Sequence, residues 1–466
     1  MEQSEYSKWA EQIAAWGQDY LDTLAQRPVR AQTLPGDIYI QIADHPPDAP
    51  EEMQSILDDF EQIIMPGITH WQHPKFFAYF PANAAPASMI AEQLISITAA
   101  QCMLWQTSPA ATELETRMVE WTRDALGLSA HFRGVIQDSA SSATLSAILT
   151  MRERAIAWRG NKSGLWGEKP IRVYASAQTH SSIDKAIWIA GIGQENLVKI
   201  PTDINYAMQP DALQNAIVED RNAGFNPAGV VLCTGGTSIG ACDDIRACLN
   251  VAKAENLYSH IDAAWAGSAM ICPEFRDIWD GANDADSIVF NPHKWLGAQF
   301  DCSIQFLAQP EDQIRTLGIQ PDYLQTFGVT DVHNYSEWTT PLGRRFRALK
   351  LWFLLRAYGI SGLQERIRNH IAWSQELCEK IASLRDFKII TEPRFSLFTF
   401  QYTPAGADAN AATKKLLDQI NNDGRTYLTQ TTHEGKFVIR MQTGQFNCTR
   451  DDVMAVFDIL RELASR

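Results

Sequence analysis

The feature that most constrains the fold is a regular alternation in the middle of the chain. Between about residues 86 and 310, short runs rich in β-branched and aromatic residues alternate with segments of helical length. Because parallel strands need a long crossover connection, this alternation is typical of βαβ units around a mostly parallel sheet. The predicted strands are 172–176, 196–201, 228–233, 257–262, 286–291 and 302–307.

The segments on either side of this core have a different character. An apolar stripe with helical spacing opens the chain, at Trp9, Ile13, Trp16 and Tyr20. An aromatic stretch interrupted by prolines follows at 71–86, and no helix can run through it. Strands are predicted at 395–400 and 436–441, before a last helix. We therefore expect three parts, an N-terminal segment at 1–85, a large α/β domain at 86–360 and a small α+β domain at 361–466.

Composition and charge limit the class of protein. The chain has 466 residues, which is more than one hydrophobic core usually serves, and its formal charge is −15. An acidic chain is a poor partner for nucleic acid or an anionic membrane surface. The eight cysteines are dispersed without CxxC spacing, so we expect no metal site and a reducing compartment. No targeting pattern and no long apolar run is evident, and we expect a cytoplasmic protein.

Two segments after predicted strands have the character of ligand sites, although each has an ordinary structural explanation. Small hydroxyl residues at 137–144 precede an apolar helix, where they serve equally as helix caps or as an anion site. His180 follows the strand at 172–176, and a lone histidine at a strand end is more often structural than catalytic.

Two further segments carry stronger signals. Asp262 closes the strand at 257–262, where open α/β sheets bind ligands, although an aspartate there could also be a helix cap. Lys294 lies between His293 and Trp295 directly after an apolar strand, and burial would make its amine a nucleophile for carbonyl groups. A lysine, a carboxylate and a phosphate-binding helix N-terminus are the set that pyridoxal 5'-phosphate (PLP) requires.

Several segments resemble the pyridoxal-dependent group II decarboxylases, most closely the aromatic-L-amino-acid decarboxylases, including their bacterial members. They are HPKFFAYFP, SPAATELE, HSSIDKA, HIDAAWAGSAMICPEF, NPHKWLGAQFDCS and PLGRRFRALKLWF, and the resemblance covers roughly residues 5–370. It implies the aspartate-aminotransferase-like fold (fold type I), an α/β architecture with a mostly parallel seven-stranded sheet and a small C-terminal α+β domain. It also implies a homodimer whose N-terminal segment packs over the partner.

The resemblance assigns roles residue by residue. Lys294 binds PLP covalently, Asp262 keeps the ring nitrogen protonated, His180 stacks on the ring, and Tyr335 on a mobile loop donates a proton to Cα. The residues implied in PLP binding are Ala140, Ser141, His180, Thr237, Asp262, Ala264, Asn291, His293 and Lys294. The residues implied in substrate binding are Trp71, Tyr79, Phe80, Pro81, Ala82, Gln101 and Met103, with Gln101 and Met103 contributed across the dimer interface. The family's Gly-Thr-Thr reads Gly235-Gly236-Thr237 here, so one hydroxyl is absent.

The implied function is decarboxylation of Trp, Tyr, Phe or dihydroxyphenylalanine to the arylalkylamine. Three alternatives remain open. An oxidative aldehyde synthase usually carries Phe at the loop position where Tyr335 is found. A glutamate-type decarboxylase needs cations for a second carboxylate, and Lys75 is the only one in 71–110. A PLP-binding protein without catalysis would be expected to lose Lys294 or Asp262.

Overall fold

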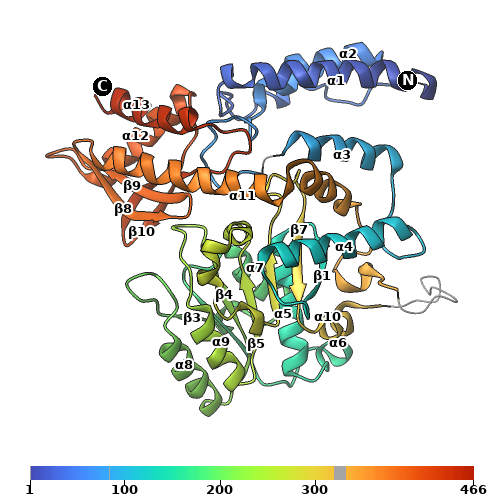
Figure 1. The fold of residues 1–466 in the computed structure, drawn as a ribbon, viewed down its shortest axis with the longest axis vertical. Helices are drawn as coiled ribbons and strands as arrows, with labels where there is room; N and C mark the ends of the chain where they lie inside the picture. Colours follow the sequence, from blue (N-terminus) through green and yellow to red (C-terminus); the bar gives the residue numbers. More distant parts are fainter. Residues whose placement is uncertain (1, 83, 320–331, 466) are drawn as a thin grey trace. The chain divides into compact units, whose positions relative to one another are not determined.

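The computed structural model describes residues 2–82, 84–319 and 332–465, which form two compact units (Figure 1). The sheet unit comprises Ala82–Ala372 and Pro393–Leu397, and the terminal unit comprises Met1–Pro81, Trp373–Glu392 and Phe398–Arg466. The division differs from the predicted three parts, because the N-terminal segment and the C-terminal domain belong to one unit. Each unit has its own core.

The sheet unit is built on seven strands in the order β1-β7-β6-β5-β4-β2-β3. These are β1 (Arg133–Gln137), β2 (Ile171–Ser176), β3 (Leu197–Ile200), β4 (Asn226–Cys233), β5 (Tyr258–Asp262), β6 (Ser287–Phe290) and β7 (Ser303–Leu307). The neighbours from β3 to β6 pair in parallel, whereas β7 is antiparallel to both β6 and β1. The mostly parallel seven-stranded sheet expected from the sequence is confirmed, and β1 is the strand that sequence periodicity missed.

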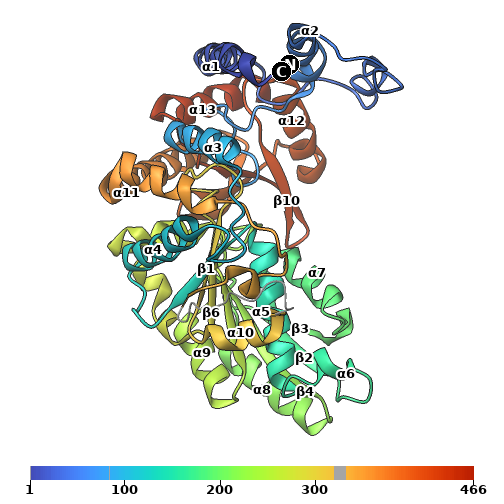
Figure 2. The ribbon, with the colours of Figure 1, turned by 90° about the vertical axis from the view of Figure 1, so that its right-hand side faces the viewer.

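Helices cover both faces of this sheet, which is why its central strands are almost continuously buried. The helices are α3 (Pro86–Thr98), α4 (Pro109–Leu126), α5 (Ala140–Ala155), α6 (Gly160–Ser163), α7 (Ser181–Ile189), α8 (Pro210–Asn222), α9 (Ile245–Ala254), α10 (Pro310–Leu317) and α11 (Arg347–Ala382), which extends into the terminal unit. Figure 2 shows α4 and α9 on one side of the sheet and α7 on the other. Ile148 and Met151 of α5 pack with Val173 and Val231 in the core.

Local sequence signals explain where these helices begin and end. Pro109 opens α4 at a position that needs no backbone N–H, and Gly127 ends it in the left-handed conformation. The Ser139 side chain caps α5 by accepting the N–H of Ser142. Because β1 ends only two residues before this cap, the cap fixes the N-terminus of α5 at the edge of the sheet.

The terminal unit combines the two ends of the chain. Its elements are α1 (Tyr6–Thr23), α2 (Met53–Asp59), β8 (Phe387–Arg394), β9 (Leu397–Tyr402), α12 (Ala409–Asp423), β10 (Thr429–His433), β11 (Lys436–Gln442) and α13 (Arg450–Ala464). The four strands form a sheet in the order β10-β11-β9-β8. Phe398, Phe400 and Ile439 form its core with Val456 and Leu460 of α13.

Within the described ranges, no helix is both long and apolar enough to cross a membrane. All eight cysteines are free, and seven of them are buried.

Candidate active site

The candidate residues meet because parallel strands end at the same edge of a sheet. β1, β2, β4, β5 and β6 run in the same direction, so the loops that follow them lie at one edge. These loops carry the predicted residues Ala140, Ser141, His180, Thr237, Asp262, Ala264, Asn291, His293 and Lys294. β7 is antiparallel and therefore begins at this edge, where Cys302 and Ser303 face the segment after β6.

The N-terminus of α5 offers backbone donors at this edge. The Ser139 hydroxyl oxygen accepts the Ser142 N–H at 3.2 Å, and the Ser139 carbonyl accepts the Ala143 N–H at 3.1 Å. The first two N–H groups of the helix, on Ala140 and Ser141, precede these bonds and have no acceptor within the helix. A helix N-terminus of this kind binds a phosphate through its N–H groups and its dipole.

Asn291 and His293 become hydrogen-bond donors because the start of β7 occupies their acceptors. The Ser303 hydroxyl donates to Asn291 Oδ1 at 2.7 Å, and the Cys302 N–H donates to His293 Nδ1 at 2.8 Å. The amide NH2 of Asn291 and the Nε2–H of His293 remain to donate to a ligand. Burial and the nearby Lys294 lower the pKa of His293 to about 3, so the ring is neutral. Sequence reasoning missed Ser303, although the quoted segment NPHKWLGAQFDCS ends on it.

Asp262 is fixed at the carboxyl end of β5 by the turn that follows it. Its Oδ1 accepts the Ala264 N–H at 3.0 Å, and its backbone carbonyl accepts the Thr234 N–H at 2.9 Å. The carbonyl of Ala264 accepts the Asn291 N–H at 2.9 Å, which joins this turn to the loop after β6. The carboxylate is buried and its Oδ2 is the oxygen left for a cationic partner.

His180 and Lys294 lie within electrostatic range of Asp262. Desolvation lowers the pKa of His180, Asp262 raises it, and Lys294 lowers it. His180 Nδ1 accepts the Ser182 N–H at 3.1 Å, so the ring is anchored at the start of α7 while its surface is exposed at the sheet edge. The backbone N–H of Lys294 donates to the carbonyl of Asn291 at 3.0 Å, which places the lysine in a tight turn.

The turn after β4 explains the glycine that departs from the family pattern. Gly235 has φ +81°, and a Cβ on Gly236 would lie 2.7 Å from the carbonyl oxygen of Gln178. Since real Cβ atoms do not approach an oxygen so closely, this turn has no room for the threonine of the family pattern at 236. Thr237 follows on the same turn and is partly buried.

This arrangement fits PLP part by part. Backbone and side-chain donors converge from α5 and the loop after β6, a buried carboxylate lies at the end of β5, and an imidazole and a lysine face the same edge. A PLP site needs an anion site, a carboxylate for the ring nitrogen, a group that covers the ring and an amine, and the residues at this edge match that set. The fold and the site together define a fold type I PLP enzyme.

The comparisons with known proteins give the family. The model of the pyridoxal-dependent decarboxylase conserved domain matches residues 35–403. Phenylacetaldehyde synthase of Arabidopsis thaliana is 38% identical over 96% of this chain and 93% of its own length. Aromatic-L-amino-acid decarboxylase of Cavia porcellus is 37% identical over 100% of this chain and 98% of its own length. The crystal structure of Oryza sativa TDC with PLP and tryptamine superposes with a TM-score of 0.95 at 30% identity, covering 100% of this chain and 98% of that one. The chain belongs to the pyridoxal-dependent decarboxylase family and is a PLP-dependent carboxy-lyase.

Tyr335 is buried, whereas the sequence predicted a position on a loop over the site. It opens the 3-10 helix η11 (Tyr335–Trp338), is 2% exposed, and packs with Val135, Leu307 and Trp338. Its hydroxyl is 2.8 Å from the hydroxyl of Thr116. The described part of the loop therefore differs from the exposed lid that the sequence predicted, because aromatic packing and this hydrogen bond hold the ring in the core. Residues 320–331 of the expected lid lie outside the described residues.

The predicted substrate residues are found in both units. Trp71, Tyr79, Phe80 and Pro81 belong to the terminal unit, whereas Ala82, Gln101 and Met103 belong to the sheet unit. Gln101 Oε1 accepts the Arg344 N–H at 2.7 Å, and the carbonyl of Met103 accepts the Ser336 N–H at 3.0 Å. Within the sheet unit these contacts tie the segment 101–103 to the segment that carries Tyr335.

Three of the predicted substrate residues in the terminal unit, Trp71, Tyr79 and Phe80, carry aromatic rings. The Trp71 and Tyr79 rings stack with centroids 5.7 Å apart, and both side chains are exposed. The Arg440 guanidinium lies 5.3 Å from the centre of the Phe80 ring. Sequence reasoning considered cations only within 71–110 and so missed Arg440, which β11 brings near Phe80.

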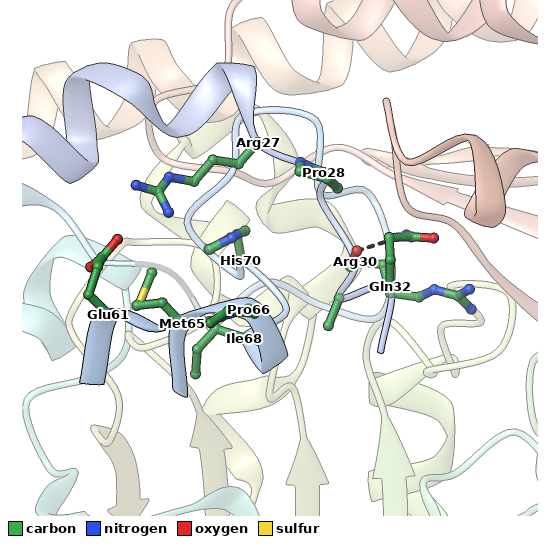
Figure 3. Close-up of a pocket in the computed structure, with 10 residues that line it drawn as sticks. Arg27, Pro28, Arg30, Gln32, Glu61, Met65, Pro66, Ile68 and His70 are labelled. Atoms are coloured by element: carbon green, nitrogen blue, oxygen red, sulfur yellow. Dashed lines mark hydrogen bonds between the residues drawn. The ribbon is translucent and has the colours of Figure 1, made fainter. Parts of the chain in front are cut away.

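A pocket of about 310 Å³ in the terminal unit does not have the character of an active site (Figure 3). Arg27, Arg30 and His70 line it, but Figure 3 shows the two guanidinium groups pointing in opposite directions. His70 Nδ1 is occupied by the Tyr20 hydroxyl at 2.9 Å. The residues that line this pocket include no lysine amine beside a buried carboxylate. The edge of the seven-stranded sheet therefore remains the candidate site.

Proposed function

We propose that this chain removes the α-carboxylate of an aromatic L-amino acid and releases CO2 and the arylalkylamine. The observation that carries the proposal is the convergence of Lys294, Asp262 and His180 at the carboxyl edge of the sheet. Relatives similar over nearly the whole chain are named aromatic-L-amino-acid decarboxylase and tryptophan decarboxylase, which supports the aromatic substrate.

Each residue of the site has a proposed task. When bound, PLP supplies an electron-accepting ring that takes up the electron pair left at Cα after CO2 departs. The Lys294 amine would hold the cofactor covalently and would give up this bond to the substrate amine. The Asp262 carboxylate holds a proton on the ring nitrogen, because a buried anion stabilises a neighbouring cation. His180 covers one ring face and restricts the orientation of the substrate.

The phosphate contacts are proposed from the donors that the fold leaves available. The N–H groups of Ala140 and Ser141, the Asn291 amide and the His293 Nε2–H provide neutral donors. Neutral donors can hold a phosphate through hydrogen bonds alone, as helix N-termini do. Thr237 and Ala264 complete the proposed cofactor contacts from the turns after β4 and β5.

The aromatic preference is supported by the surfaces of the residues proposed to bind the substrate. Trp71, Tyr79 and Phe80 offer ring area, and burying an aromatic side chain is worth roughly 1.5–3 kcal/mol. Ala82, Gln101 and Met103 complete the proposed set. The sequence argument against an acidic substrate was that Lys75 is the only cation in residues 71–110. Arg440 is a second cation, near Phe80, so that argument alone does not decide between aromatic and acidic substrates.

A homodimer is supported by apolar side chains that each unit leaves exposed. On α3 the exposed residues Ile90, Leu94 and Ile97 share one face, and in the terminal unit Leu34 and Tyr39 are 72% and 79% exposed. Exposed apolar groups of this size commonly mark protein interfaces. The stripe on α1 is less open than expected, because Trp16 and Tyr20 pack on Phe60 and His70. Sedimentation should show a dimer, and an active monomer would refute it.

The buried free cysteines support a cytoplasmic location.

The experiment that tests the function measures products from a panel of amino acids. Purified protein with PLP is incubated with Trp, Tyr, Phe, dihydroxyphenylalanine and Glu, and CO2, amine, aldehyde and peroxide are quantified. We expect equal amounts of CO2 and amine, with kcat/KM for the best aromatic substrate exceeding that for Glu by orders of magnitude. Faster turnover of Glu would overturn the aromatic assignment. Stoichiometric aldehyde and peroxide would instead indicate an aldehyde synthase, which is how the Arabidopsis thaliana relative is named.

A further inference from the structure

The start of α7 is capped in an unusual way. His180 occupies the N-cap position with extended backbone angles, φ −68° and ψ 147°, and its ring accepts the N–H of Ser182. Small side chains such as Ser, Thr, Asp and Asn normally fill this position. Here the imidazole Nδ1 replaces the usual oxygen, so the helix cap and the ring proposed to cover the cofactor belong to one side chain.

Two donors from Ser182 converge on the same ring nitrogen. The backbone N–H of Ser182 is 3.1 Å from His180 Nδ1, and the Ser182 hydroxyl is 2.8 Å from the same atom. A backbone N–H can only donate, so Nδ1 must present its lone pair. In the neutral ring the proton is therefore on Nε2, and the hydroxyl strengthens this preference by donating to Nδ1 as well.

Protonation of the ring would break this arrangement. A hydrogen on Nδ1 would face the Ser182 N–H, and the positive end of the α7 dipole also disfavours a cation there. The charged groups that act on the ring come from three elements, Asp262 on β5, Lys294 after β6 and Asp184 on α7 itself. The two carboxylates favour the imidazolium, whereas desolvation and Lys294 oppose it, and the pKa of His180 is lowered overall.

We propose that Ser182 is a positioning residue that holds His180 as the neutral Nε2–H tautomer at the face of the cofactor ring. The proposal rests on the proposed role of His180 in covering that ring. A cationic imidazole there would repel a protonated ring nitrogen and compete with it for Asp262. A neutral ring avoids this repulsion and still has one N–H donor, on Nε2.

The chain offers matched variants for the test. Ser182→Ala removes the hydroxyl and keeps the backbone N–H, and Ser182→Thr restores a hydroxyl. Ser181→Ala is the control, because Ser181 is the neighbouring residue at the start of the same helix and is exposed. Since one hydrogen bond to the neutral form is lost, we expect Ser182→Ala to raise the pKa of His180 by roughly half to one unit.

The primary measurement is made on the protein without PLP. Imidazole 15N shifts of labelled protein, assigned with His180→Asn, report the tautomer and the pKa of His180. We expect Nδ1 unprotonated and Nε2 protonated in the unmodified protein, a raised pKa in Ser182→Ala, and unmodified behaviour in Ser182→Thr and Ser181→Ala. A proton on Nδ1 in the unmodified protein, or an unchanged pKa in Ser182→Ala, would overturn the proposal.

A second measurement separates this proposal from the proposed function. In the loaded enzyme the acid limb of kcat/KM should move to higher pH in Ser182→Ala, because His180 then becomes protonated at a higher pH. An acid limb that stays in place while the 15N shifts move would also overturn the proposal, since His180 protonation would then not matter for turnover. If no aromatic amino acid is decarboxylated, the function fails, and the measurement without PLP still decides the role of Ser182.

Discussion

Replacing Tyr335 with phenylalanine should lower stability and leave the amine product unchanged. The hydroxyl of Thr116 donates to the carbonyl of Thr112 at 3.0 Å, so its 2.8 Å contact with Tyr335 requires the phenol to donate. Burial and the nearby Glu115 raise the pKa of Tyr335, which further holds the proton on the ring oxygen. The proton that the sequence assigned to the substrate is therefore engaged inside the protein.

The size of the effect follows from this hydrogen bond. Tyr335→Phe removes one hydrogen bond and keeps the ring packing, which should cost about 0.5–1.5 kcal/mol in the free energy of unfolding. Thr116→Val removes the same bond from the other side and leaves a buried phenol without its acceptor, which should cost about 1–3 kcal/mol. Thr116→Val should therefore be at least as destabilising as Tyr335→Phe.

The assay combines unfolding with product analysis. Denaturant unfolding gives the free energies of both variants, and amine, aldehyde and peroxide are quantified from the same preparations. We expect both variants to form amine in the same ratio to CO2 as the unmodified enzyme. If Tyr335→Phe alone yielded aldehyde and peroxide, the hydroxyl must leave Thr116 to protonate Cα, and our interpretation of Tyr335 as a core residue would be refuted.

Three further predictions concern the site and its support. Asp262→Ala should weaken PLP binding about 10- to 100-fold, since a charge-assisted hydrogen bond is worth about 1.5–3 kcal/mol; an unchanged Kd in an absorbance titration would contradict this. His180→Ala should keep covalent PLP, seen as an unchanged absorption band, but lose at least tenfold in kcat, and normal kinetics would place the ring elsewhere. Arg344→Met breaks an ion pair with Glu115 in which the side chains are 1% and 2% exposed, and this should cost about 3–5 kcal/mol in the free energy of unfolding. Arg368→Met breaks an exposed ion pair and should leave the melting temperature unchanged. Equal melting temperatures for the two variants would contradict the last prediction.

The sheet and its ligand edge could be predicted from the sequence because strand periodicity carries that information. Strands such as 258–262 are short apolar runs between helical segments, and their order along the chain is enough to place Asp262 and Lys294 at strand ends. β1 was missed because Arg133–Gln137 contains glycine and ends on polar residues, so no apolar run marks it. Its place in the sheet depends on pairing with β7, which is distant in sequence.

The parts of the site that escaped prediction depend on contacts between distant segments. Ser303 became part of the site only because β7 runs antiparallel and starts beside Asn291. Arg440 reaches Phe80 through the fold of the terminal unit, and no local pattern links the two. Tyr335 was placed on a lid because polar neighbours surround it in sequence, whereas its packing partner Leu307 is supplied by β7. Periodicity and motif spacing do not report such partners.

The central claim is that the carboxyl edge of the seven-stranded sheet is the active site and that Lys294 is its reactive amine. Borohydride reduction of the PLP-loaded protein, followed by peptide mapping, tests it most directly. We predict one pyridoxyl group per chain, on Lys294, and loss of labelling when an aromatic amino acid occupies the site before reduction. A pyridoxyl group on any other lysine, or none at all, would contradict the account.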